Sequence, residues 1–175
     1  MTRARRIALA ALLAATAGCG TSSSNNNGGD GGIPQVDPAV QHNLDGLNAY
    51  RAQNGAAALT LDAQLSQFAL VGSMQLEQTS VAHGHFMDAA NSGALWNEGF
   101  CHTAGENQAP GWSAANVNAT IDDVLAQMMA EGPGAPGKPN HHDNIIDPQF
   151  TRVGIGLVID VGKLWLTNDF SGPCP

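Results

Sequence analysis

Histidine and glutamate side chains from separate segments are the residues of this chain best suited to chemistry. His83 and His85 flank a single glycine, and Glu106 stands in a Gly-Glu-Asn triplet. Glu131 directly precedes a Gly-Pro-Gly turn, and His141 begins a His-His-Asp-Asn run. Imidazole nitrogens and carboxylates gathered from separate elements can bind a divalent cation or transfer protons. These segments are therefore the predicted functional region.

The position of Glu131 supports this prediction. Apolar residues recur at helical spacing over 118–131, and the Gly-Pro-Gly sequence that follows cannot continue a helix. The helix dipole disfavours a carboxylate at a helix C-terminus, and a nearby cation or proton donor would relieve this. Each residue also has a structural interpretation: Glu106 can accept hydrogen bonds from loop amides, and His141 can be an ordinary loop histidine.

The elements that must position these residues begin with helices. Asp37-Pro38 predicts a capped helix start, and apolar spacing continues to Tyr50 before Gly55. Asp62 predicts the cap of a second helix reaching about Leu76. The stretch 83–113 is rich in Gly and Asn with few periodic signals, which predicts a long loop or a few short turns.

A β-hairpin is predicted near the C-terminus. Alternating apolar residues over 153–159 and 164–168 flank an Asp-Val-Gly-Lys turn. Gly154 and Gly156 fall on one face of the first strand, so another element must approach closely there. Helices followed by a terminal hairpin indicate the α+β class.

The N-terminus is predicted to be a processing segment. Three arginines precede a short apolar run over 7–17, which is too short for a stable membrane span. The run ends at Thr-Ala-Gly-Cys, which is similar to a lipoprotein cleavage site, so 1–18 is a predicted signal peptide and Cys19 a predicted lipidated residue. Thr16 stands where leucine is usual, and ordinary signal cleavage with secretion is the alternative.

A tether and one domain are predicted to follow. Residues 19–33 hold the predicted lipidated cysteine and a flexible linker, since Ser, Asn and Gly dominate them. Residues 34–175 suffice for one compact domain. Without the three signal arginines, four basic residues face fifteen acids, a formal charge of −11. This charge repels polyanions, which excludes nucleic acid as an expected partner and leaves the lipid anchor as the expected membrane contact.

Two cysteines remain once Cys19 carries lipid. Cys101 and Cys174 belong to an exported chain, where oxidising conditions favour a disulfide. Two free thiols too far apart to meet are the alternative.

The order of short sequence blocks resembles the CAP superfamily of cysteine-rich secretory, antigen 5 and pathogenesis-related proteins. The resemblance runs from about Leu47 to Phe170. It rests on Leu-Asn-Ala-Tyr-Arg-Ala-Gln-Asn-Gly at 47–55, Gly-Glu-Asn at 105–107, the block 141–148, and Phe-Thr-Arg-Val-Gly-Ile-Gly at 150–156. It implies a three-layer α/β/α sandwich with a central antiparallel sheet.

The resemblance also implies a cleft with two histidines and two glutamates. Matched by motif, these are His83, Glu106, Glu131 and His141, with His85 the alternative to His83. The two imidazoles can bind zinc as a possible cofactor.

Three functions are then open for a domain of the bacterial cell envelope. The first is a binding or scaffold domain that accepts a cation, small ligand or lipid. The second is a metal-dependent hydrolase, although no His-Glu-x-x-His helix is present. The third is a cell-surface interaction module with a vestigial cleft.

Overall fold

The computed structural model describes residues 36–175. The predicted signal peptide, the predicted lipidation site Cys19 and the predicted linker lie outside the described residues. Five α-helices and four strands are present in the described part of the chain: α1 (Pro38–Gln53), β1 (Thr60–Leu61), α2 (Ala63–Thr79), α3 (Gly84–Ser92), β2 (Ala104–Ser113), α4 (Val117–Ala130), α5 (His141–Ile146), β3 (Arg152–Asp160) and β4 (Lys163–Ser171), with a 3₁₀ turn, η1 (Ala94–Glu98), after α3.

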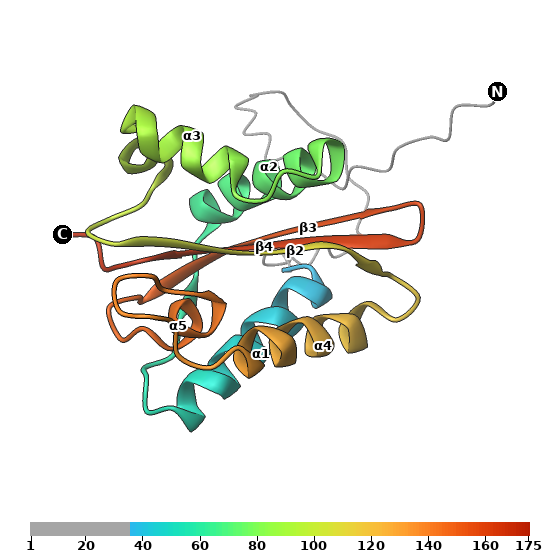
Figure 1. The fold of residues 1–175 in the computed structure, drawn as a ribbon, viewed down its shortest axis with the longest axis horizontal. Helices are drawn as coiled ribbons and strands as arrows, with labels where there is room; N and C mark the ends of the chain where they lie inside the picture. Colours follow the sequence, from blue (N-terminus) through green and yellow to red (C-terminus); the bar gives the residue numbers. More distant parts are fainter. Residues whose placement is uncertain (1–35) are drawn as a thin grey trace, which may run out of the picture.

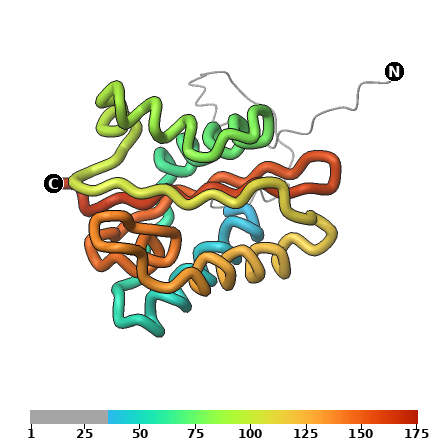
Figure 2. The backbone as a smooth tube through the Cα atoms, viewed as in Figure 1, coloured from blue at the N-terminus to red at the C-terminus, as the bar shows by residue number. Residues whose placement is uncertain are grey.

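The elements form three layers. The sheet lies in the middle, with α2 and α3 on one face and α1, α4 and α5 on the other (Figure 1). The tube drawing shows the same order and places β2 along the front edge, between the two helical layers (Figure 2). The predicted α+β sandwich is thereby confirmed.

The sheet is mixed. Its strand order is β1-β3-β4-β2; β3–β4 and β4–β2 are antiparallel, and the two-residue β1 pairs with β3 in parallel. The three long strands form the predicted antiparallel sheet, and the short β1 adds one parallel pair at its edge. Asp62 follows β1 directly and starts α2, so the chain passes from the sheet edge into the covering helix within one residue.

Local signals set the helix ends. Asp37 accepts from the N–H of Ala39, and Asp62 accepts from those of Gln64 and Leu65, so both predicted N-caps are confirmed. Glu131 is the C-cap of α4, as the Gly-Pro-Gly sequence predicts.

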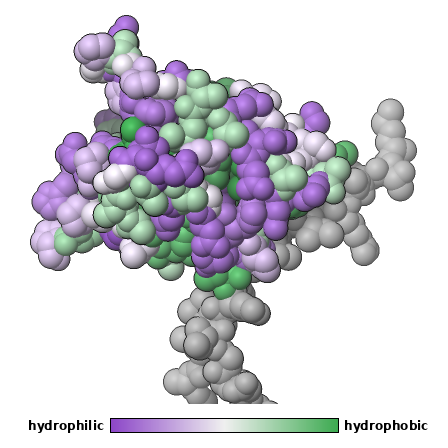
Figure 3. Space-filling view, turned by 90° about the horizontal axis from the view of Figure 1, so that it is seen from below, coloured by the Kyte–Doolittle hydropathy of each residue, from purple (hydrophilic) through white to green (hydrophobic). Residues whose placement is uncertain are grey.

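Apolar packing joins the layers on both sides of the sheet. A large core cluster lies between the sheet and α1, α4 and α5, and a smaller one, built on Leu65, Phe68, Leu95 and Phe100, lies on the α2 side. A Cβ on Gly154 would lie 2.1 Å from a backbone atom of Leu65, which confirms the predicted close approach. Figure 3, viewed from the side of α1, α4 and α5, shows hydrophilic residues interspersed with apolar ones over the outer face.

The segment 83–113 is not the predicted loop. It contains α3, η1 and the ten-residue strand β2. The alternation of apolar residues that marks a strand is absent from β2 because it buries Glu106, Asn107 and Gln108 instead. Polar residues thus fill both of its faces, and periodicity could not reveal it.

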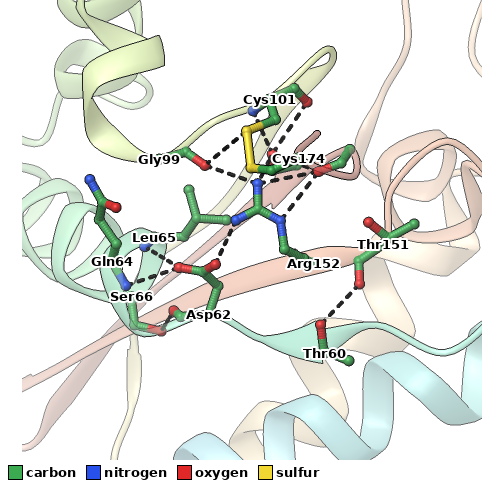
Figure 4. A network of polar contacts seen from close by, with 12 residues as sticks. Thr60, Asp62, Gln64, Leu65, Ser66, Gly99, Cys101, Thr151, Arg152 and Cys174 are labelled. Carbon is green, nitrogen blue, oxygen red and sulfur yellow. Dashed lines mark hydrogen bonds and ion pairs between the residues drawn. A yellow bond between two sulfur atoms is a disulfide. The ribbon is translucent and has the colours of Figure 1, made fainter.

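A polar network closes the end of the sandwich where β2 begins. The guanidinium of Arg152 donates to Asp62, to the carbonyls of Gly99 and Gly172, and to the hydroxyl of Ser171 (Figure 4). The predicted disulfide between Cys101 and Cys174 is confirmed beside it, with an S–S distance of 2.02 Å. This end therefore fixes the segment that leads into β2.

Candidate functional site

His83 occupies an unusual backbone conformation at the start of α3. Its φ of 60° and ψ of 7° place it in the left-handed region, which costs a non-glycine residue roughly 1 kcal/mol. Two contacts hold it there: its N–H donates to Gln108 Oε1 at 2.7 Å, and its ring Nδ1 lies 2.8 Å from Glu106 Oε1. Strand β2 thus fixes both the backbone and the ring of this histidine.

Glu106 is the buried partner in this pair. Its side chain is 1% exposed, whereas that of His83 is 39% exposed. An ionised carboxylate only accepts hydrogen bonds, so the imidazole Nδ1–H is the donor. The hydrogen bond to Glu106 raises the pKa of His83, although partial burial of the ring opposes this.

Glu131 and His141 form a second pair with the same chemistry. Glu131 Oε1 lies 2.6 Å from His141 Nδ1, and Glu131 Oε2 accepts from the backbone N–H of His141 at 3.2 Å. The carboxylate at the C-terminus of α4 thus receives two donors from the first residue of α5, which relieves the unfavourable end of the α4 dipole.

The two pairs face one cleft. His83, Glu106, Glu131 and His141 line a hollow of about 250 Å³ together with Pro139, Asn140 and Asn144. The rings of His83 and His141 have centroids 6.4 Å apart and planes inclined by 32°. Residues from α3, β2, α4 and α5 are therefore gathered at one place, although they span 59 positions of the sequence.

Two asparagines connect the halves of the cleft, and sequence reasoning missed this role. Asn144 Nδ2 donates to Asn107 Oδ1 at 2.9 Å and to the carbonyl of Glu106 at 3.2 Å. Asn107 Nδ2 donates to the carbonyl of His141 at 2.9 Å. Asn107 lies in β2 and holds α5 against this strand. Its only sequence signal is its place in the Gly-Glu-Asn triplet.

His85 has a different environment. Its ring lies against Phe68, with centroids 4.2 Å apart, and its Nε2 is buried without a hydrogen-bond partner. It does not line the hollow between His83 and His141. The structure therefore places His83, and not His85, beside Glu106.

A second hollow adjoins the first. It has a volume of about 450 Å³, lies between β2 and α4, and shares Glu131 and His141 with the smaller cleft. Strand β2 has a register irregularity between Ala109 and Trp112 at this point, and both residues line the hollow. Its other walls include Val124 and Met128 of α4.

The described side chains do not themselves form a metal-binding cluster. Within residues 36–175, no three His, Cys, Asp or Glu side chains are arranged so that together they could hold a metal ion. With each Nδ1 bonded to a glutamate, the nitrogen left for a ligand on each imidazole is Nε2. The cleft thus offers two candidate nitrogen ligands, and no third protein ligand is arranged with them.

The part of the chain that the structure describes contains no helix long and apolar enough to cross a membrane.

Comparison with known proteins identifies the family of this chain. A model of the cysteine-rich secretory protein family (CAP) matches residues 44–164. The uncharacterized protein YkwD of Bacillus subtilis is 31% identical over 132 residues, which are 71% of this chain and 44% of that protein. The chain thus spans less than half the length of that relative.

Solved structures share the fold at low sequence identity. An extracellular protein with an SCP domain from Bacillus anthracis is 22% identical, with a TM-score of 0.56 over 81% of this chain and 45% of that one. The structure of NaASP2 with Zn²⁺ is 10% identical, with a TM-score of 0.55 over 79% of this chain and 83% of that one. At these identities the likeness extends to the fold alone.

Proposed function

Because this chain belongs to the cysteine-rich secretory protein (CAP) family, we propose that it is an extracytoplasmic binding domain whose cleft accepts a divalent metal ion through His83 and His141. The observation that carries the proposal is the pairing of each imidazole with its own glutamate at the rim of one hollow.

Such pairing is typical of metal-binding histidines. A ligating histidine almost always donates its other ring N–H to a carboxylate or carbonyl, which fixes the tautomer and makes the ligating nitrogen more basic. Glu106 and Glu131 occupy that position for Nδ1 of His83 and His141. Zinc suits two imidazole nitrogens, with water or a bound ligand completing its shell.

The family resemblance adds limited support. One CAP structure with the same fold contains Zn²⁺, but its 10% identity does not extend to individual residues. Two protein ligands predict weaker binding than a structural zinc site with four. The metal is therefore proposed as an exchangeable partner of the cleft and not as a structural element.

Binding is favoured over hydrolysis by the lining of the cleft. The seven lining residues include no serine, threonine or cysteine that could act as a nucleophile. A hydrolase would have to use metal-bound water, and no feature of the described residues indicates a substrate. The metal-dependent hydrolase and the vestigial-cleft module are the alternatives. An absence of zinc binding would contradict the hydrolase as well as the metal proposal and would favour the module.

The test is calorimetric titration of the purified protein with zinc at pH 7.5 and pH 5.5. We expect binding at the higher pH and much weaker binding at the lower, because protonated imidazole cannot ligate. The double substitution His83→Ala with His141→Ala should abolish binding while circular dichroism stays unchanged.

His42→Ala is the matched control. His42 is also paired with a carboxylate, with Nε2 lying 2.8 Å from Asp122 Oδ1, but it lies on α1, away from the cleft. Zinc binding that survives the double substitution, or no binding by the parent protein, would refute the metal proposal. The second result would favour the interaction module.

We also propose that Cys19 carries lipid and that residues 20–33 tether the domain to a bacterial envelope membrane. The sequence pattern before Cys19 supports this proposal.

A further inference from the structure

Asp169 is a fully buried acidic residue with no hydrogen-bond partner. Its exposed fraction is 0%, and neither carboxyl oxygen receives a hydrogen bond. It lies on β4, directly opposite Glu106 of β2 and Gly154 of β3. Directly opposed residues project from the same face of a sheet, and Gly154 packs against Leu65 of α2, so Asp169 faces the α2 layer.

Glu106 and Asp169 have opposite hydrogen-bond environments. Glu106 lies 2.8 Å from His83 Nδ1 and accepts from Gln108 Nε2 at 3.4 Å. Asp169 lies in the same buried layer without any donor. A buried carboxylate without donors or a paired cation is strongly disfavoured, whereas a neutral carboxylic acid is tolerated.

The nearest cation on β3 does not compensate Asp169. Arg152 is paired with Ser171, two residues along β4, but its donors go to Asp62, Ser171 and the carbonyls of Gly99 and Gly172. The ring of His85 packs against Phe68 of α2, and its buried Nε2 makes no hydrogen bond, so His85 does not donate to Asp169. The other titratable or charged groups on the elements around Asp169 are Glu106 on β2, Arg152 and Asp160 at the two ends of β3, Lys163 at the start of β4, Asp62 and Glu77 at the ends of α2, and His83, His85 and Asp88 on α3 or its first turn.

We propose that Asp169 is a neutral carboxylic acid in the folded protein and takes up a proton on folding, so that it limits the negative charge behind the cleft. Burial raises the pKa of Asp169 well above its ordinary value, and the charge of Glu106 raises it further. A second carboxylate at this position would favour protonated imidazole in the cleft, and protonated imidazole cannot bind a metal. By staying neutral, Asp169 keeps a second negative charge away from Glu106 and the cleft, whichever ligand the cleft binds.

The proposal makes a signed prediction about stability. A raised folded-state pKa means that the unfolded chain releases the Asp169 proton at a lower pH than the folded chain does. Stability from this group is complete below the ordinary carboxyl range and is lost as pH rises toward the folded pKa. In that window the unfolding equilibrium constant increases about tenfold per pH unit.

The test compares the parent protein with Asp169→Asn, whose amide has the shape of the neutral acid but cannot titrate. Unfolding in urea is measured from pH 5 to pH 8 at fixed ionic strength. We expect the ratio of the two unfolding constants, parent over variant, to increase with pH, by up to about tenfold per pH unit as long as the folded Asp169 stays protonated. Asp88→Asn, an exposed position on α3, is the control and should give a ratio independent of pH.

A ratio for Asp169→Asn that is independent of pH would overturn the proposal. A second measurement needs no variant and decides the matter if Asp169→Asn does not fold. The carbon-13 chemical shift of the Asp169 side-chain carboxyl in the parent protein should remain that of a protonated acid at pH 6. A carboxylate shift at that pH would equally overturn the proposal.

Discussion

Asn144 of α5 donates its side-chain amide to the side-chain oxygen of Asn107 of β2 at 2.9 Å. The same amide reaches the carbonyl of Glu106, and the amide of Asn107 reaches the carbonyl of His141. The two asparagines therefore set the distance between the His83–Glu106 pair and the Glu131–His141 pair. This connection therefore helps to hold the four ionisable side chains at one cleft.

Asn144→Ala should lower the free energy of unfolding by about 1–3 kcal/mol, because it leaves the buried Asn107 oxygen without a donor. Zinc affinity should fall as well, since α5 carries His141. Urea denaturation and zinc titration measure the two effects. Asn118→Ala, at an exposed position of α4, is the control and should change neither. Unchanged stability and affinity in Asn144→Ala would show that packing alone holds α5 in place.

Arg51→Lys should destabilise the fold by more than about 3 kcal/mol. The fully buried guanidinium donates to the carbonyls of Ala57, Ile145, Asp147 and Phe150. Lysine cannot reproduce this fork of donors, and each buried carbonyl left unpaired costs about 1–3 kcal/mol, with incomplete additivity. Denaturation measures the loss, and hydrogen exchange should show faster opening of α5. A loss below about 1 kcal/mol would contradict this role.

The His83–Glu106 pair should make stability depend on pH. The pKa of His83 is raised above its ordinary 6.5, so its contribution is complete below the unfolded-state value and is lost as pH rises through the folded value. The stability difference between the parent protein and His83→Ala should therefore be larger at pH 5.5 than at pH 8.5. NMR titration should also place the His83 midpoint above the ordinary value and lower it in Glu106→Gln. An unshifted midpoint in the parent protein would contradict the pairing.

Replacing Cys101 and Cys174 together with alanine should lower the free energy of unfolding by about 4 kcal/mol, because the bridge closes a loop across 73 positions. Denaturation of the parent under non-reducing conditions is the reference. Mass spectrometry of protein isolated from the envelope should find the two residues linked. Detection of both as free thiols would contradict the bridge.

Cys19→Ala should abolish lipid attachment, and with it either processing of the N-terminus or retention of the domain on membranes. Fractionation of cells and the mass of the mature N-terminus measure the two outcomes. A variant that remains on membranes and is processed as the parent is would contradict lipid attachment at Cys19.

Short-range chemistry in the sequence was enough to predict much of the fold. The N-caps at Asp37 and Asp62, the end of α4 at Glu131 and the β3–β4 hairpin all depend on residues a few positions apart. Gly154 also predicted a close packing contact, because a strand glycine has no side chain to bury. The disulfide followed from counting cysteines in a chain that the sequence predicts to be exported.

Only the tertiary structure decided the details of the cleft. Strand β2 could not be predicted because its buried residues are polar and find their partners on α3, α4 and α5. The choice between His83 and His85 depends on the left-handed turn that directs one ring to Glu106 and the other to Phe68. Asp169 gave no sequence signal, since an acidic residue becomes unusual only when folding removes its water and supplies no donor. Hydrophobic periodicity in the sequence predicts which residues pack against apolar neighbours. It does not predict which polar groups form hydrogen bonds between the layers.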